Sequence, residues 1–274
     1  MTIWWSIMVA VGMANFLAAA FIVCKSLKWS KTEPESKKTF SLLRACVVVF
    51  AAVAAYRTVF VSSYPDRMVW FDSMWNSPFL IRCLAACAEM SAVTIVAVTL
   101  LRLNRQYEIS GRKLFSKAPI ISMICIFAAQ FFAFGGLVTQ YTTLFGIEEF
   151  LWMFAFLCFV PLVFLGLRKI KTGGIAQGRQ KLFFRVMAVW LVGYLAFQIF
   201  YALPFMYFFE MAGDIGKAVP PGALRAAIFD FTVQRGFHEW GGIGFMIWHS
   251  AYFAVTTWVY LFAFMAARKP YEKK

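Results

Sequence analysis

The sequence predicts an all-α integral membrane bundle of seven transmembrane helices. First, 62% of its 274 residues are hydrophobic and only 15% are charged, whereas soluble domains carry roughly 25% charged residues. Second, several apolar stretches reach the roughly 20 residues with which a helix crosses a bilayer. Third, the short segments of alternating polarity that are typical of a transmembrane β-barrel are absent.

Each expected span is a long apolar run, and basic residues follow the first, third, fifth and seventh of them. The first run lacks basic residues before it, so we expect a retained helix rather than a cleaved signal peptide. No linker or low-complexity segment interrupts the series, which predicts one domain over residues 1–274. The seven spans are Ile3–Cys24, Phe40–Ser62, Phe79–Leu101, Ile120–Thr142, Ile147–Leu167, Phe184–Phe208 and Gly242–Ala267.

The distribution of positive charge predicts the orientation. Lysine and arginine mark the cytoplasmic loops of membrane proteins, and 21 of the 27 basic residues fall on one predicted side. The N-terminus is therefore expected outside or in a lumen, and the C-terminus in the cytoplasm. The net charge of +14 is explained by topology, not by nucleic acid. The basic residues are Lys25, Lys28, Lys31, Lys37, Lys38, Arg44, Arg102, Arg105, Arg112, Lys113, Lys117, Arg168, Lys169, Lys171, Arg179, Lys181, Arg185, Arg268, Lys269, Lys273 and Lys274.

Two outer segments, Ser63–Pro78 and Phe209–Gly241, are long and mix charges with large aromatic residues. Such segments suit a cap over an outward-facing cavity, although Trp75 and Trp240 also fit an aromatic belt at headgroup level. Within the second segment, Leu224–Phe231 is expected to form a short helix on the outer membrane face.

Glu89 is the acidic residue that lies deepest in an apolar run. Helix rise places it about 15 Å from the outer end of its span, close to the middle of the bilayer. An ionisable group at that depth is costly and indicates function. Arg82, seven residues earlier, shares a face of the same helix. Either Arg57 or Arg82 is a candidate partner, which leaves open a purely structural ion pair.

Other polar residues are expected in the outer half or near mid-depth of the spans. Gln130, Gln198 and Asn15 are typical of hydrogen bonds between helices. Together with Arg57 and His249, they predict an outward-facing polar pocket that ends at Glu89.

Several function classes are excluded by residues that the sequence lacks. The two histidines, His238 and His249, are about 16 Å apart along a helix, so they do not share a metal. The spans contain no interior lysine for a retinal Schiff base, and no phosphate-binding or hydrolase motif appears. We therefore expect no metal and no cofactor.

The favoured hypothesis is an intramembrane enzyme that applies acid–base chemistry to a lipid or isoprenoid-like substrate, as in an isomerase or cyclase. A protonated Glu89 would act as general acid, and His249 and Tyr252 would relay protons. The expected partners are membrane lipids and a hydrophobic or amphipathic small molecule. The substrate-binding candidates are Arg57, Arg82, Gln130, Gln198, Tyr201, Trp75 and Trp240.

Two other functions stay open. In a proton- or ion-coupled transporter or channel, Glu89 would be the coupling site, and Pro161 and Pro204 would kink helices around a path. Against this, no inverted repeat is found. In a seven-helix receptor or sensor, the aromatic outer segments would meet an extracellular ligand.

Overall fold

The computed structural model describes residues 1–29, 33–64, 66–175 and 178–268. Four of the residues used to predict orientation, Lys31, Lys269, Lys273 and Lys274, lie outside these ranges. The elements in chain order are α1 (Thr2–Ser26), η1 (Pro34–Ser36), α3 (Lys37–Val59), β1 (Ser62–Ser63), β2 (Met68–Val69), η2 (Met74–Asn76), α4 (Pro78–Tyr107), α5 (Lys113–Thr139), α6 (Thr142–Leu157), α7 (Val160–Lys171), α8 (Gly178–Phe197), η3 (Gln198–Phe208), η4 (Met211–Asp214), α9 (Ala223–Phe229), β3 (Thr232–Val233), α10 (Gly242–Ser250), η5 (Ala251–Val255) and α11 (Thr256–Ala266).

Within these described ranges, the chain is all-α apart from three two-residue strands. In its described part, six helical stretches are long and apolar enough to cross a membrane, which indicates an integral multi-pass membrane protein. They are Thr2–Ser26, Pro34–Val59, Pro78–Tyr107, Lys113–Thr139, Thr142–Lys171 and Gly178–Asp214. The stretch expected as the seventh span is divided among α10, η5 and α11. The count of seven and the side of each terminus stay predictions.

Three of the expected spans, the fifth, sixth and seventh, change their helical geometry part-way. The fifth consists of α6 and α7, and Pro161 lies in the first turn of α7, where its missing N–H breaks no helical bond. In the sixth, α8 continues as η3, a π-helix with Pro204 inside it. A proline removes a backbone donor, and a wider turn accommodates the loss. η5 is also a π-helix.

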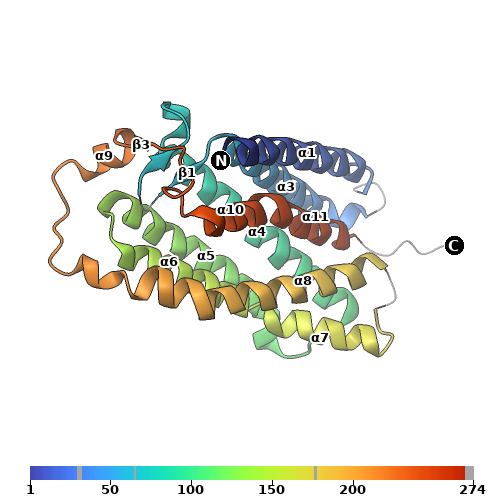
Figure 1. Ribbon diagram of the computed structural model, residues 1–274. Coiled ribbons are helices and arrows are strands. Elements are labelled where there is room, and N and C mark those ends of the chain that lie inside the picture. The colour runs from blue at the N-terminus through green and yellow to red at the C-terminus, as the bar shows by residue number, and fades with distance from the viewer. Residues whose placement is uncertain (30–32, 65, 176–177, 269–274) are drawn as a thin grey trace.

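Helix α4 lies at the centre of the bundle, packed against α3, α5 and α11. Figure 1 shows the three strands and α9 gathered at one end of the bundle, while α7 lies near the other end. Helices α1 and α3 approach closely at Gly12, where a Cβ atom would collide with the Thr58 side chain. Such contacts at small residues are typical of helix packing in membranes.

A compact cap covers the end of the bundle that carries the strands. β2 pairs antiparallel with β1 and parallel with β3, so the two long outer segments join in one small sheet. Beneath it, Trp70 packs between Trp5 and Trp240. The short helix expected near Leu224–Phe231 is confirmed as α9.

Candidate functional site

Arg82 and Glu89 on α4 form the centre of a buried polar network. Arg82 is 2% exposed and Glu89 5%. The Arg82 Nη2 atom donates to Glu89 Oε2 over 2.5 Å and to Gln130 Oε1 over 2.5 Å. Seven residues are about two helical turns, so both side chains lie on one face of α4, the face that meets Gln130 on the neighbouring helix α5. Of the two arginines proposed as partners, Arg82 is the one that binds Glu89.

Gln130 on α5 completes this network. Its Nε2 atom donates to Glu89 Oε2 over 3.0 Å and to the Ile126 carbonyl over 2.9 Å. A single Glu89 oxygen thus accepts from both Arg82 and Gln130. Gln130 links helices as expected, and it does so at the Glu89 carboxylate.

Two further carboxyl groups, which sequence reasoning missed, belong to the same centre. Arg82 Nη1 donates to Glu148 Oε1 over 3.2 Å, and Glu148 is 7% exposed. The next residue, Glu149, is half-buried and accepts from Gln198 Nε2 over 2.6 Å. The expected fifth span began at Ile147, which placed both acids at the membrane edge. Since α6 begins at Thr142 instead, Glu148 lies about 9 Å inside the helix.

Glu149 connects the centre to the sixth expected span through its hydrogen bond with Gln198. Gln198, the first residue of the π-helix η3, is 1% exposed and also contacts the Tyr194 hydroxyl over 2.8 Å. This predicted residue therefore joins the centre through an acid that was not predicted. Two consecutive acids beside a long apolar run were the sequence signal that could have found it.

Arg57 near the end of α3 lies close to the centre without bonding to its carboxyl groups in the described residues. It is 5% exposed and within electrostatic range of Glu148. Its guanidinium carbon is 5.3 Å from the ring centroid of Tyr64 and 4.7 Å from that of Phe253. The Tyr64 ring lies 5.5 Å from the Arg82 guanidinium carbon as well, so one outer-loop tyrosine touches both arginines.

The remaining sequence candidates lie in different parts of the structure. His249 is 2% exposed and packs on Phe253, while Tyr252 lies 5.9 Å from Arg57, so both belong to the surroundings of Arg57.

Trp75 and Tyr201 are 67% and 52% exposed and do not reach the centre. Trp240 is buried in the outer cap. Asn15 bonds to the Ala254 carbonyl and to Trp258 Nε1, which confirms its interhelical role.

The formal charges of this cluster do not balance. Two arginines, Arg57 and Arg82, face three carboxyl groups, Glu89, Glu148 and Glu149. Full ionisation of all five groups would leave one net negative charge in the bundle. An unpaired buried charge is strongly disfavoured in a medium of low dielectric constant. The cluster therefore has one carboxyl group more than its arginines neutralise.

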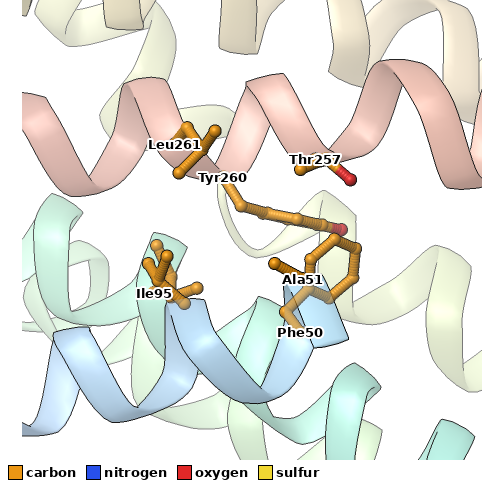
Figure 2. A pocket seen from close by; sticks show the side chains of 7 residues that line it. Phe50, Ala51, Ile95, Thr257, Tyr260 and Leu261 are labelled. Carbon is orange, nitrogen blue, oxygen red and sulfur yellow. The ribbon is translucent and has the colours of Figure 1, made fainter. Parts of the chain in front are cut away.

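Below the centre, the bundle is tightly packed. Tyr260 lies across the gap between α11, α3 and α4, next to Phe50 at a ring distance of 4.5 Å (Figure 2). That gap does not have room for a water molecule. A second cavity of about 320 Å³ lies at the capped end, among Met74, Trp75, Ser77, Phe79, Leu80, Cys83 and Ile228.

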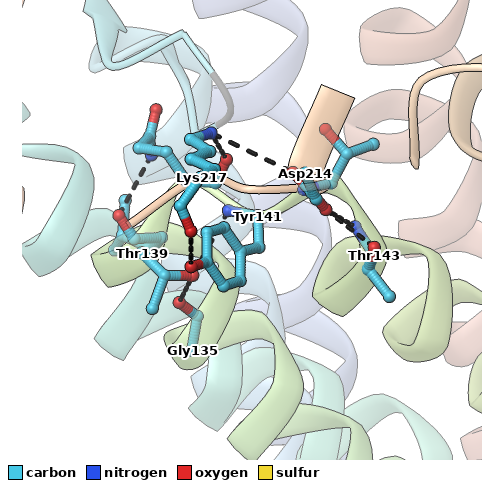
Figure 3. A network of polar contacts seen from close by, with 9 residues as sticks. Gly135, Thr139, Tyr141, Thr143, Asp214 and Lys217 are labelled. Carbon is cyan, nitrogen blue, oxygen red and sulfur yellow. Dashed lines mark hydrogen bonds and ion pairs between the residues drawn. The ribbon is translucent and has the colours of Figure 1, made fainter. Parts of the chain in front are cut away.

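Asp214 in η4 holds the start of α6, the helix that carries Glu148 and Glu149. Its carboxylate accepts from the Thr142 and Thr143 backbone N–H groups over 3.2 and 2.7 Å and from the Thr143 hydroxyl over 2.7 Å (Figure 3). Free N–H groups at a helix start need such acceptors. Here a residue distant in the sequence supplies the cap.

Replacing Asp214 with alanine is expected to lower the free energy of unfolding by about 1 kcal/mol, the usual worth of a helix cap. Unfolding of the detergent-solubilised protein would measure it. Glu210→Ala, which changes a nearby exposed carboxylate, is the control. Equal stability of the two variants would show that the Asp214 contacts do not hold α6.

No group of three or more His, Cys, Asp or Glu residues in the described ranges is arranged to hold a metal ion. The expectation that the protein uses no metal or cofactor stays a prediction. Searches with protein-family models, against curated proteins and against solved structures found no match to this chain. The function is therefore argued from the site itself.

Proposed function

We propose that this membrane protein is an acid–base enzyme for a lipid-like substrate, and that its reactive proton resides on the Glu148–Glu149 pair. The supporting observation is the excess of one carboxyl group over the two arginines. Neutrality of the buried cluster then requires one bound proton. A proton held in this way is available for transfer to a substrate, which is the task of a general acid.

The hydrogen bonds favour Glu148 and Glu149 over Glu89 as the carrier of this proton. Glu89 accepts from Arg82 and from Gln130 at one oxygen, so it serves as the fixed counter-charge of Arg82. Glu148 has one longer contact with Arg82, and Glu149 has a neutral amide partner. The role of general acid, first expected of Glu89, is therefore assigned in this proposal to Glu148 and Glu149 on α6. Glu89 instead serves as the counter-charge of Arg82.

The cavity at the capped end supports a hydrophobic substrate. Its volume is within the usual range of ligand sites, and its walls are apolar apart from Ser77. It borders α4 at Phe79 and Cys83, which flank Arg82 in the sequence. A lipid-like molecule could approach the centre from this side, while the packing around Tyr260 closes the opposite side.

A proton-coupled transporter is the second candidate, and the π-helical segments favour it. η3 begins at Gln198, and η5 contains Tyr252 and Phe253 beside Arg57. π-helical turns occur frequently at functional sites, and a change of register in either segment would move a residue of the centre. Vesicles containing the protein and a pH-sensitive dye distinguish the two functions, because only the transporter would carry protons down an imposed pH gradient.

We further propose seven spans with the N-terminus outside. In a variant without native cysteines, a cysteine at Arg225 in α9 should react with a membrane-impermeant maleimide on intact cells. A cysteine at Lys113, at the start of α5, should react only after permeabilisation. Both positions are exposed. The reverse pattern would overturn the orientation.

Infrared spectroscopy of the protein in lipid nanodiscs tests the bound proton, because a protonated carboxyl group has a C=O band that an ionised one lacks. By charge balance, the wild type should hold one buried proton at neutral pH. Glu148→Gln and Glu149→Gln should each hold none, since each removes one acid. Arg57→Gln should hold two, since it removes one cation.

Glu210→Gln, at an exposed position, is the matched control and should keep the wild-type band. A wild type without a protonated carboxyl band at neutral pH would refute the proposal. So would a band that persists unchanged in both α6 variants.

A further inference from the structure

The guanidinium group of Arg57 is buried and has no polar partner in the part of the chain that the structure describes. The residue is 5% exposed, yet among the described residues no hydrogen bond or ion pair joins its guanidinium group to a neighbour. Arg82, by contrast, donates to Glu89, Gln130 and Glu148. A guanidinium group carries five N–H donors, and buried donors are normally paired.

Aromatic rings surround this guanidinium group. The ring centroids of Phe253, Tyr64 and Tyr252 lie 4.7, 5.3 and 5.9 Å from its central carbon. Cation–π contacts stabilise a buried positive charge, but they leave the N–H donors in the guanidinium plane unsatisfied. The cage therefore holds Arg57 in place while its hydrogen-bonding edge stays available.

Two more unpaired polar atoms belong to the residues around Arg57. The Tyr64 hydroxyl and His249 Nδ1 are both enclosed by protein and lack a hydrogen-bond partner. His249 is 2% exposed, and its ring lies 4.5 Å from that of Phe253. Burial raises the pKa of the Tyr64 phenol, so its hydroxyl keeps its proton and can donate. The His249 ring donates to the Arg57 backbone carbonyl, so its free Nδ1 atom is an acceptor. The free donors of Arg57 and of the Tyr64 hydroxyl point to a missing acceptor.

We propose that the Arg57 guanidinium and the Tyr64 hydroxyl form a binding site for the carboxylate head of a monoanionic amphiphile, of the fatty-acid type, with His249 as part of the wall of that site. This inference rests on the proposed function and names the substrate class of that site. The planar guanidinium fork matches a carboxylate with two parallel hydrogen bonds. A doubly charged phosphate is disfavoured, because one free arginine would face it beside the carboxyl groups of α6. The aromatic walls suit an apolar chain.

Tyr64 connects this site to the acidic cluster. Its ring contacts the guanidinium groups of both Arg57 and Arg82. It is contributed by the outer segment directly after β1. A carboxylate held at Arg57 would thus keep the adjoining part of its chain close to Glu148, the nearest proton donor in the proposed mechanism.

Binding of oleate to the full-length protein in nanodiscs tests the proposal. Tryptophan fluorescence is a suitable signal, because Trp248 stacks on Tyr252 and Trp4 packs on His249. Oleyl alcohol supplies the same chain without the charge, and acetate supplies the charge without the chain. We expect saturable oleate binding at least about tenfold tighter than that of either comparison ligand.

Arg57→Gln should weaken oleate binding at least about tenfold, and Tyr64→Phe, which keeps the ring, should weaken it several-fold. Arg225→Gln, an exposed arginine on α9, should bind as the wild type does. Absence of oleate binding, or equal binding of oleyl alcohol, would overturn the proposal. Unchanged affinity in both Tyr64→Phe and Arg57→Gln would also overturn it. If Arg57→Gln does not fold, unchanged affinity in Tyr64→Phe alone would overturn it.

These measurements are independent of the proton count. If oleate binds through Arg57 but the carboxyl band is absent, the binding site stands and the acid–base function fails. If the band is present and oleate does not bind, the proposed function stands with a different substrate class.

Discussion

Arg82→Gln is expected to be the most destabilising single substitution at the buried centre, lowering the free energy of unfolding by about 3–5 kcal/mol. Arg82 is the shared cation of Glu89 and Glu148, and it also holds the Gln130 amide oxygen. Glutamine would leave two carboxyl groups without their cation at membrane depth. The effect is measurable as the loss of folded protein during denaturant titration in mixed micelles.

The double variant Arg82→Gln/Glu89→Gln separates charge from packing. Removing both partners of a buried ion pair costs far less than removing one, so this variant should recover much of the lost stability. Arg225→Gln, at an exposed position, should have nearly wild-type stability. If the double variant were as unstable as Arg82→Gln, lost packing around Arg82 rather than the unpaired carboxylate would explain the effect.

Glu89→Gln is expected to fold and to reach the membrane but to lose activity by about 100-fold or more, the usual contribution of a general acid or base. Glutamine is nearly isosteric and can still accept from Arg82. With one carboxyl group fewer, however, the remaining two acids balance the two arginines. The cluster then needs no proton and has none to donate.

Activity can be followed as the conversion of a total lipid extract by the reconstituted protein, with products measured by mass spectrometry. Glu210→Gln changes an exposed carboxylate and should be as active as the wild type. Full activity of both Glu89→Gln and Glu89→Ala would refute a catalytic role for this centre.

The site shows where sequence reasoning succeeded and where it stopped. Glu89 stood out because a single acid interrupted a long apolar run, and Arg82 followed from helical periodicity. Glu148 was missed because hydropathy placed the start of its helix five residues too late. Tyr64 lies in a loop, and no periodic pattern relates a loop residue to two arginines on different helices.

The sequence by itself determined an all-α, multi-pass membrane protein, because the energy of transfer into a bilayer depends mainly on composition and segment length. It also determined that polar residues would concentrate around Glu89. Only the tertiary structure decided that Arg82 rather than Arg57 pairs with Glu89, and that two further acids lie near these arginines. It also decided that no described residue forms a hydrogen bond or an ion pair with the Arg57 guanidinium. Such pairings depend on how α3, α4, α5 and α6 pack side by side, and the composition of any single helix carries no information about the rotation of its neighbours.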